Sequence, residues 1–411
     1  SLASFRFSYS NSWMIFDIEP YRKTTNNLFS TSSVDLGTYN YTNNHTGANK
    51  IPNKQINDFK QSQLILHFRG FGIGYGYLNH WWGPGFHSAI TLSSNAPSQE
   101  TYSIGTFKDI RFGNFAFGAK IIAMPYKNLN GEELYFSGLK TRMVIKSDPI
   151  ITLQFHRTYL SGNFYNLNNK TNFKDRWTIK DAVRLVVEPV FGQNKQDLDY
   201  TIPGTPGFDP WDEIMSGFIE LTFPKDDLRL YLELASDDSR GTLTDLMAHW
   251  DHTLALIIGG TKYHSFGKYK LFIGLEYLST KISNTYKKEF YRGNPNGSIY
   301  YAYEMYDYFT YNGRRMGAHS GSNSDDSIIL LGIGKKNKIS YLSFNLERHG
   351  LKTMDFPEIK NEISFTYKSK ISKHHSIVLS LEYEKINNFG FLENNSSISR
   401  VLWLGYSINL Y

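Results

Sequence analysis

Residues 70–97 read GFGIGYGYLNHWWGPGFHSAITLSSNAP, and this stretch establishes the pattern that organises the chain. Glycines at positions 70, 72, 74 and 76 alternate with Phe71, Ile73, Tyr75 and Tyr77. Because successive strand side chains point to opposite faces, the alternation predicts a strand with one bare face and one aromatic face. A bare face lets another segment of backbone or a ligand approach closely. The residues WWGPG at 81–85 then predict a tight aromatic turn.

The same two-residue alternation recurs along the rest of the chain. One run has Leu271, Ile273, Leu275 and Tyr277 on one face and Lys270, Gly274 and Glu276 on the other. Similar runs cover residues 228–234, 342–347, 362–368, 376–384 and 401–411. The runs reach about 10–14 residues, whereas ordinary strands are nearer 5–6. Long strands with one apolar and one ionic face predict an all-β fold, a transmembrane antiparallel β-barrel of about 18 strands with lipid outside and a polar lumen plugged by loops.

Length and composition exclude several other classes of protein. A chain of 411 residues has room for two or three domains or for one large β-structure. It contains no cysteine, which excludes disulfides and thiolate metal sites and is compatible with an oxidising compartment. The net charge of +6 is small and dispersed, so nucleic acid is not an expected partner. No apolar run is long enough for a helical membrane span, and no signal segment precedes the first strand, as in a mature or trimmed chain.

No domain linker interrupts the pattern, so a single barrel domain is expected over residues 1–411. Long loops are expected at residues 24–60, 192–213, 284–298 and 311–326, where polar residues, proline or glycine replace the alternation. The segment Thr242–His249 has helix-like spacing and predicts a short helix within a loop.

Two motifs connect this chain to a known family. The first is WGPG at 82–85 followed by LSSNAP at 92–97, and the spacing between its halves makes it specific. The second is YNGRRMG at 311–317, followed by Gly321 and Ser322. With these motifs the sequence resembles the Wzi-type capsule-assembly family of outer-membrane β-barrels. The resemblance implies a barrel of about 18 strands in the bacterial outer membrane that binds surface or capsular polysaccharide and helps hold the capsule to the cell.

The sequence departs from this family in two respects. The small periplasmic helical bundle that some members carry has no counterpart in the sequence. The final residue, Tyr411, is aromatic, as barrel-insertion signals tend to be, but lies out of phase with the apolar stripe of the closing strand.

The aromatic turn supplies the first candidate ligand contacts. Trp81 and Trp82 can stack on sugar rings, because a flat aromatic face suits the apolar face of a pyranose and the indole N–H adds a donor. The alternative is that one of them packs against the glycine face or lies in an interfacial girdle. Asn95 either caps its own turn or contacts the ligand.

The second motif supplies the charged candidates. Arg314 and Arg315 can hold the carboxylates of an acidic polymer bidentately, or can pair with Asp325 and Asp326 and fix the loop. The aromatic run that ends at Tyr311 offers either a stacking platform or an interfacial girdle. The predicted polysaccharide site comprises Trp81, Trp82, Asn95, Tyr308, Tyr311, Arg314, Arg315, His319 and Asp325.

No metal or cofactor is expected from the sequence. His80 and His87 flank the tryptophans, and His249 and His252 are three residues apart. A metal site needs three or four ligands with a supporting second shell, and the sequence completes no such set around either pair.

Catalysis is likewise not expected. Glycoside hydrolysis uses two carboxylates, and candidates occur at Asp237 with Asp238, Asp325 with Asp326, and Asp209 with Asp212 and Glu213. Adjacent residues on a strand face opposite ways, however, and the sequence contains no GxSxG elbow, phosphate-binding loop or HExxH motif.

The sequence therefore predicts a non-enzymatic outer-membrane barrel, surrounded by lipid, that binds or anchors surface or capsular polysaccharide. Two alternatives remain open at this point. One is a structural subunit that recruits other outer-membrane proteins into an assembly. The other is a diffusion channel.

Overall fold

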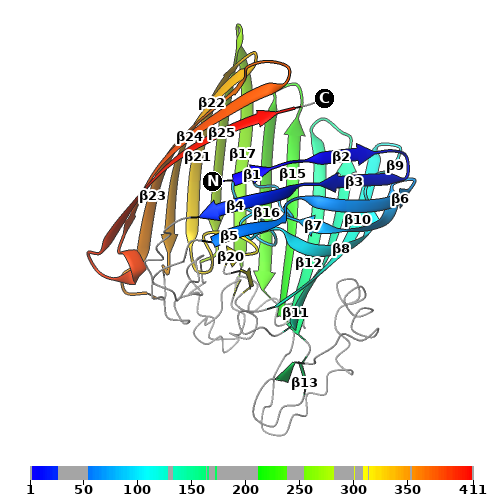
Figure 1. Ribbon diagram of the computed structural model, residues 1–411, viewed down its shortest axis with the longest axis horizontal. Helices are drawn as coiled ribbons and strands as arrows, with labels where there is room; N and C mark the ends of the chain where they lie inside the picture. Colours follow the sequence, from blue (N-terminus) through cyan, green and yellow to red (C-terminus); the bar gives the residue numbers. More distant parts are fainter. Residues whose placement is uncertain are drawn as a thin grey trace.

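The computed structural model describes residues 2–25, 54–127, 133–162, 164–165, 172–173, 212–237, 254–281, 300, 309–312, 314–351 and 354–409. Its main feature is an antiparallel sheet of 18 strands that curls into a barrel (Figure 1). The predicted all-β barrel of about 18 strands is confirmed. Among the described residues, no helix has the length and apolar character needed to cross a membrane.

The first half of the barrel is a series of hairpins in chain order. Its strands are β2 (Phe7–Ser10), β3 (Met14–Ile18), β6 (Ser62–Phe68), β7 (Phe71–Leu78), β8 (Gln99–Thr106), β9 (Ile110–Phe112), β10 (Phe115–Lys127), β11 (Glu133–Ile145) and β12 (Ile150–Gly162). Strands β8 and β9 both pair with β10, so they follow one another along the same side of it.

The second half continues the same pattern with strands of 10 to 13 residues. They are β15 (Asp212–Phe223), β16 (Leu228–Asp237), β17 (Ala255–Phe266), β18 (Tyr269–Ser279), β21 (Asp325–Lys335), β22 (Lys338–His349), β23 (Glu358–Lys370), β24 (His375–Asn387) and β25 (Ser396–Ile408). Each pairs antiparallel with its neighbour in this order, and β12 joins the two halves by pairing with β15.

In the described part of the chain, three small sheets and one short helix lie outside the main sheet. They are β1 (Leu2–Ser4) with β4 (Pro20–Thr25) and β5 (Lys54–Phe59), β13 (Phe164–Tyr165) with β14 (Asn172–Phe173), β19 (Thr310–Tyr311) with β20 (Arg314–Arg315), and the 3-10 turn η3 (Phe389–Phe391). The segment predicted as a loop at 24–60 is therefore shorter, because β5 occupies its end. The predicted helix at 242–249 and the terminal Tyr411 lie outside the described residues.

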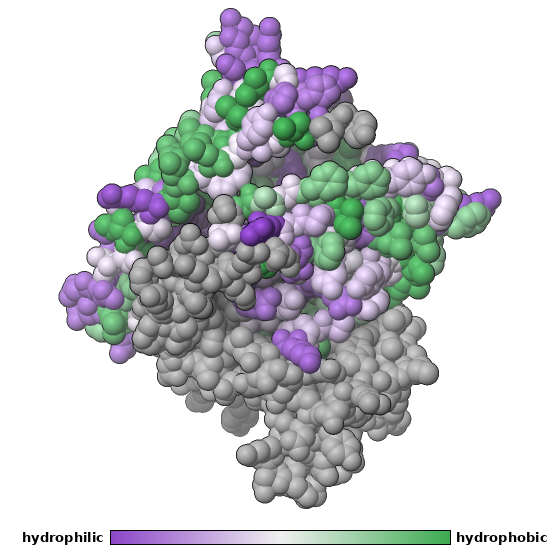
Figure 2. All heavy atoms as spheres, viewed as in Figure 1, coloured by the Kyte–Doolittle hydropathy of each residue, from purple (hydrophilic) through white to green (hydrophobic). Residues whose placement is uncertain are grey.

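The alternation of each strand separates a lipid face from a lumen face. On β18, Leu271, Ile273 and Leu275 are 38%, 42% and 50% exposed on the outer wall, whereas Glu276 is 5% exposed and points inward. Hydrophobic side chains accordingly gather over both flanks of the barrel, and hydrophilic ones gather at the upper tip (Figure 2). Exposed apolar area on this scale is stable only against lipid or another apolar surface.

The two ends of the barrel differ in the length of their connections. Residues 11–13, 69–70, 113–114, 224–227, 267–268 and 336–337 make short turns at one end. At the other end, residues 79–98 join β7 to β8, and the stretches of sequence that separate β12 from β15, β16 from β17 and β18 from β21 are also long. Exposed Phe68, Phe112 and Phe266 lie beside the turns, as expected of an aromatic girdle. Since outer-membrane barrels have short periplasmic turns and longer extracellular loops, the turn end faces the periplasm.

The glycine-rich strand β7 turns its bare face into the lumen. Phe71 and Ile73 are 54% and 56% exposed on the outer wall, and the alternating Gly74 faces inward. A Cβ at Gly74 would lie 3.4 Å from the ring of Phe107 and 2.7 Å from the hydroxyl of Ser103. The bare face thus accommodates lumen side chains at close range.

Candidate functional site: the plug inside the barrel

Two connections fold back into the barrel, and we call their described residues, 79–98 and 309–324 without 313, the plug. Ala89 and Ile90 in the first segment and Ala318 in the second are fully buried, and Met316 is 1% exposed. Ile90, Met316 and Ala318 belong to the hydrophobic core, together with lumen-facing side chains of β10, β11, β12 and β15 to β18. The predicted plugging of the lumen by loops is confirmed.

The two plug segments bind each other through the two sequence motifs. The N–H of Ser93 donates to the carbonyl of Met316 at 2.7 Å, and its hydroxyl donates to the carbonyl of Gly317 at 2.5 Å. The side-chain amide of Asn95 donates to the carbonyl of Arg315 at 2.8 Å. Motifs separated by more than 200 residues in the chain therefore form one buried unit.

A glutamate on the wall fixes the first plug segment. The carboxylate of Glu276 accepts hydrogen bonds from the main-chain N–H groups of Phe86, His87 and Ser88 at 2.7, 3.3 and 2.7 Å. The hydroxyl of Tyr231 donates to the same carboxylate at 2.6 Å. These bonds satisfy a turn whose backbone would otherwise lack partners inside the barrel.

The two tryptophans of the first motif occupy different environments. Trp82 is 4% exposed and packs on Gly138 of β11, where a Cβ would lie 2.8 Å from its ring. Its ring centroid lies 5.4 Å from that of His156. Trp81 is partly exposed, and its indole N–H donates to the carbonyl of Gly85 at 3.0 Å. Trp82 therefore packs the plug against the wall, and Trp81 remains accessible.

A pocket of about 360 Å³ adjoins Trp81 on the lumen side of β10 and β11. Lys120, Lys140 and Arg142 supply three cations to its lining, and Asp109 supplies the carboxylate. Asp109 forms an ion pair with Arg142, and the Lys120 ammonium lies 4.4 Å from the ring centroid of Phe107. The lining thus combines an indole ring with a net positive charge.

Histidine adds no charge to this pocket. His80 is half-buried beside Trp81, and its Nε2 lies 3.1 Å from the hydroxyl of Thr101. Burial, with smaller contributions from the positive charges of Lys120 and Lys140, lowers the pKa of His80 to about 3. The imidazole is therefore neutral at physiological pH.

The second motif divides its two arginines between the interior and the surface. Arg315 is fully buried, with its guanidinium 5.0 Å from the ring centroid of Tyr300. Arg314 is exposed on β20. Tyr311 packs edge-on against Tyr126, with 5.7 Å between ring centroids. Tyr308 lies outside the described residues.

Asp325 and Asp326 face opposite sides of the wall, as expected of neighbours on a strand. Asp325 pairs with Lys281 and Arg348 on the outer side. Asp326 points inward to His87 and His319, each of which has Nε2 at 3.1 Å from its Oδ2. The alternative in which Arg314 and Arg315 fix the loop through these aspartates is therefore corrected, because Lys281 and Arg348 pair with Asp325 and the two histidines lie against Asp326.

Sequence reasoning missed the residues that the tertiary structure gathers around the plug. Lys120, Lys140 and Glu276 carry only the signal of a polar residue on a strand, which dozens of positions share. Sequence reasoning also missed that His319 and Asp326 meet His87 inside the lumen. No spacing in the sequence indicates these encounters.

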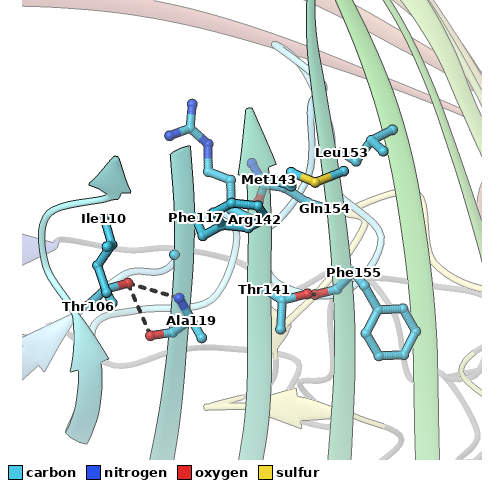
Figure 3. Close-up of a pocket in the computed structure, with 11 residues that line it drawn as sticks. Thr106, Ile110, Phe117, Ala119, Thr141, Arg142, Met143, Leu153, Gln154 and Phe155 are labelled. Atoms are coloured by element: carbon cyan, nitrogen blue, oxygen red, sulfur yellow. Dashed lines mark hydrogen bonds between the residues drawn. The ribbon is translucent and has the colours of Figure 1, made fainter. Parts of the chain in front are cut away.

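A second hollow lies on the lipid side of the wall. It measures about 490 Å³ and is lined mainly by outward side chains such as Ile110, Met143 and Phe155 (Figure 3). The hydroxyl of Thr106 there bonds both the N–H and the carbonyl of Ala119. Its apolar lining fits acyl chains of the surrounding bilayer.

An apolar outer wall, short turns at one end, long connections at the other and a buried plug define a transmembrane β-barrel of the bacterial outer membrane. No protein-family model and no curated protein matches the sequence. The fold is similar to that of Wzi, an outer-membrane protein involved in group 1 capsule assembly in Escherichia coli and a carbohydrate-binding β-barrel. That similarity has a TM-score of 0.65 at 12% sequence identity and covers 99% of this chain and 77% of Wzi. The resemblance to Wzi-type barrels is confirmed at the level of the fold.

Other solved barrels are more distant. OccAB3 of Acinetobacter baumannii has a TM-score of 0.46 at 9% identity, covering 99% of this chain and 90% of that one. OpdQ of Pseudomonas aeruginosa has a TM-score of 0.46 at 8% identity, covering 100% and 91%.

Proposed function

We propose that this protein is a non-enzymatic outer-membrane barrel that binds an acidic surface or capsular polysaccharide. The pocket beside Trp81 carries the proposal, because an indole ring lies there with Lys120, Lys140 and Arg142. Sugar rings stack on flat aromatic faces, and cations pair with the carboxylates of acidic sugars. The shared fold with Wzi, a carbohydrate-binding barrel, supports the same class of ligand.

The residues of the predicted site take different roles in this proposal. Trp81 is the stacking residue, and Arg314 with Tyr311 forms a second contact at the loop end. The buried Trp82 and Arg315 pack the plug, and Asn95 joins its two segments. Asp325 is engaged by Lys281 and Arg348 and stabilises the rim.

Retention of the host's own polysaccharide by the detergent-purified full chain tests the proposal. We expect Trp81→Ala and Lys140→Gln each to weaken retention about tenfold, equivalent to about 1.4 kcal/mol. Trp403→Ala is the matched control, because Trp403 lies on β25 and does not line the pocket. Double variants that include Trp82 or Arg315 are uninformative, since they disturb buried packing.

The outcomes discriminate between sites and between functions. If Arg314→Ala no longer retains the polysaccharide and Trp81→Ala retains it fully, the polysaccharide contact lies at the loop end and not in the pocket beside Trp81. A wild-type protein that retains no polysaccharide overturns the proposal. Stoichiometric copurification of other proteins then favours the scaffold, and single-channel conductance in a planar bilayer favours the channel.

A further inference from the structure

Three side chains from separate parts of the chain converge near the loop end of the lumen. His87 lies in the first plug segment, His319 in the second, and Asp326 is the second residue of β21 on the wall. Nε2 of each imidazole lies 3.1 Å from Oδ2 of Asp326, and all three atoms lie within 4.8 Å of one another. The two rings meet at 85° with centroids 4.8 Å apart.

The oxygen at the centre of this cluster lacks a hydrogen-bond donor. Asp326 is 1% exposed, and its Oδ2 accepts no hydrogen bond from the described residues even though two ring nitrogens lie at 3.1 Å. A buried carboxylate without compensation is strongly unfavourable. Nitrogen and oxygen atoms this close without a well-aligned N–H between them are typical of ligands around a shared cation.

The spacing agrees with a tetrahedral metal site. Ligands held about 2.0–2.1 Å from a Zn²⁺ ion lie about 3.3 Å from one another, close to the separations found here. The outer contacts also orient the ligands. Nδ2 of Asn345 donates to Oδ1 of Asp326 at 2.5 Å, and the main chain of His87 is held by Glu276. Such supporting bonds fix the direction of ligand lone pairs in metal sites.

We propose that His87, His319 and Asp326 bind a divalent transition metal of the Zn²⁺ class. Two imidazoles and a carboxylate match the ligand preference of that class, and three protein ligands leave a fourth position for water. Glu347 is an alternative fourth ligand, since its Oε1 lies 3.5 Å from Nε2 of His319. The ion joins both plug segments to the wall and thereby stabilises the plugged state.

This proposal is independent of polysaccharide binding, because none of the three ligands lines the pocket beside Trp81. The competing account is a purely ionic cluster in which both histidines are protonated against Asp326 and Glu347. Lys360 already donates to Oε1 of Glu347 at 2.7 Å, so that account places several cations together around two carboxylates. Metal binding distinguishes the two accounts directly.

The test uses the full chain, purified in detergent, stripped with EDTA and titrated with Co²⁺ as a spectroscopic substitute for Zn²⁺. We expect one Co²⁺ per chain with the visible absorption of a tetrahedral site, and its displacement by Zn²⁺. Zn²⁺ should also raise the thermal midpoint of the stripped protein by several degrees. A stripped wild-type protein that binds no Co²⁺ at this stoichiometry overturns the proposal without the need for any variant.

Variants then assign the ligands. His319→Gln and Asp326→Asn should abolish both the Co²⁺ absorption and the Zn²⁺-dependent stabilisation. His80→Gln is the matched control, because His80 lies in the same plug segment but bonds Thr101 instead. Retention of the folded barrel in each variant is checked by heat-modifiable migration on gels. Wild-type Co²⁺ binding in a folded His319→Gln protein would contradict the assignment.

Discussion

The carboxylate of Glu276 on β18 accepts a hydrogen bond of 2.7 Å from the main-chain N–H of Ser88 in the plug. Its other oxygen accepts a bond of the same length from Phe86. One acidic side chain on the wall thus satisfies a whole turn of the plug. These hydrogen bonds stabilise the plug inside the barrel, because buried N–H groups without partners are unfavourable.

We expect Glu276→Ala to destabilise the plug without unfolding the barrel. Each buried N–H left without a partner costs about 1–3 kcal/mol, so a loss of at least about 2 kcal/mol should lower the thermal midpoint in detergent. Glu382→Ala is the control, because Glu382 also faces the lumen but lies on β24, away from the plug. Equal midpoints for the two variants would contradict the anchoring role.

Gly138 is expected to tolerate no side chain. A Cβ there would lie 2.8 Å from two ring carbons of Trp82, so Gly138→Val should cost about 1–3 kcal/mol through overpacking. Gly217→Val is the matched control on β15, where the nearest atom to a Cβ is 3.7 Å away. Thermal unfolding of both variants measures the difference. A neutral Gly138→Val would show that Trp82 repacks freely.

A lysine substitution should be strongly destabilising at one of two neighbouring leucines on β21 and tolerated at the other. Leu331 is 40% exposed on the outer wall, and the adjacent Leu330 faces the lumen. Leu331→Lys should cost about 2–4 kcal/mol near the middle of the bilayer, whereas a lysine at position 330 can be hydrated. Folding into lipid vesicles, followed by urea titration, measures both. A larger penalty at position 330 would reverse the assignment of faces.

We expect acidic pH to destabilise the folded protein because His80 is neutral in the plug. Its pKa is lowered from 6.5 to about 3, so the unfolded chain binds more protons than the native protein between these values. Stability therefore falls as the pH decreases from about 7 to about 5. We expect the thermal midpoint of His80→Gln to fall less over this range than that of the wild type. His374→Gln, in an exposed turn, should behave like the wild type, and an unchanged slope in His80→Gln would refute the assignment.

The alternation of residues such as Leu271 to Glu276 was sufficient to predict the strands and their two faces. A strand in lipid has apolar side chains on one side because no water hydrates them there, and the period of two records this directly. That loops plug the lumen was also predicted from the sequence. The side chains that the plug contains could not be predicted, because a connection has no periodicity that would locate them.

The predicted polysaccharide residues illustrate the same division. Trp81 and Trp82 are adjacent and chemically identical, and both border the same pocket, yet Trp81 is partly exposed whereas Trp82 is buried against Gly138. Arg314 and Arg315 divide in the same way between surface and interior. Residue type predicted the chemistry available to each pair, and only the path of the backbone decided which member a ligand can reach.

The sequence by itself determined the barrel, its lipid-facing wall and the segments that interrupt it, because these depend on local alternation. The tertiary structure alone decided which residues meet inside the lumen. His87 and His319 are 232 positions apart and share Asp326 only because two connections fold back against β21. Encounters of this kind depend on loop closure across the barrel, for which a linear pattern holds no signal.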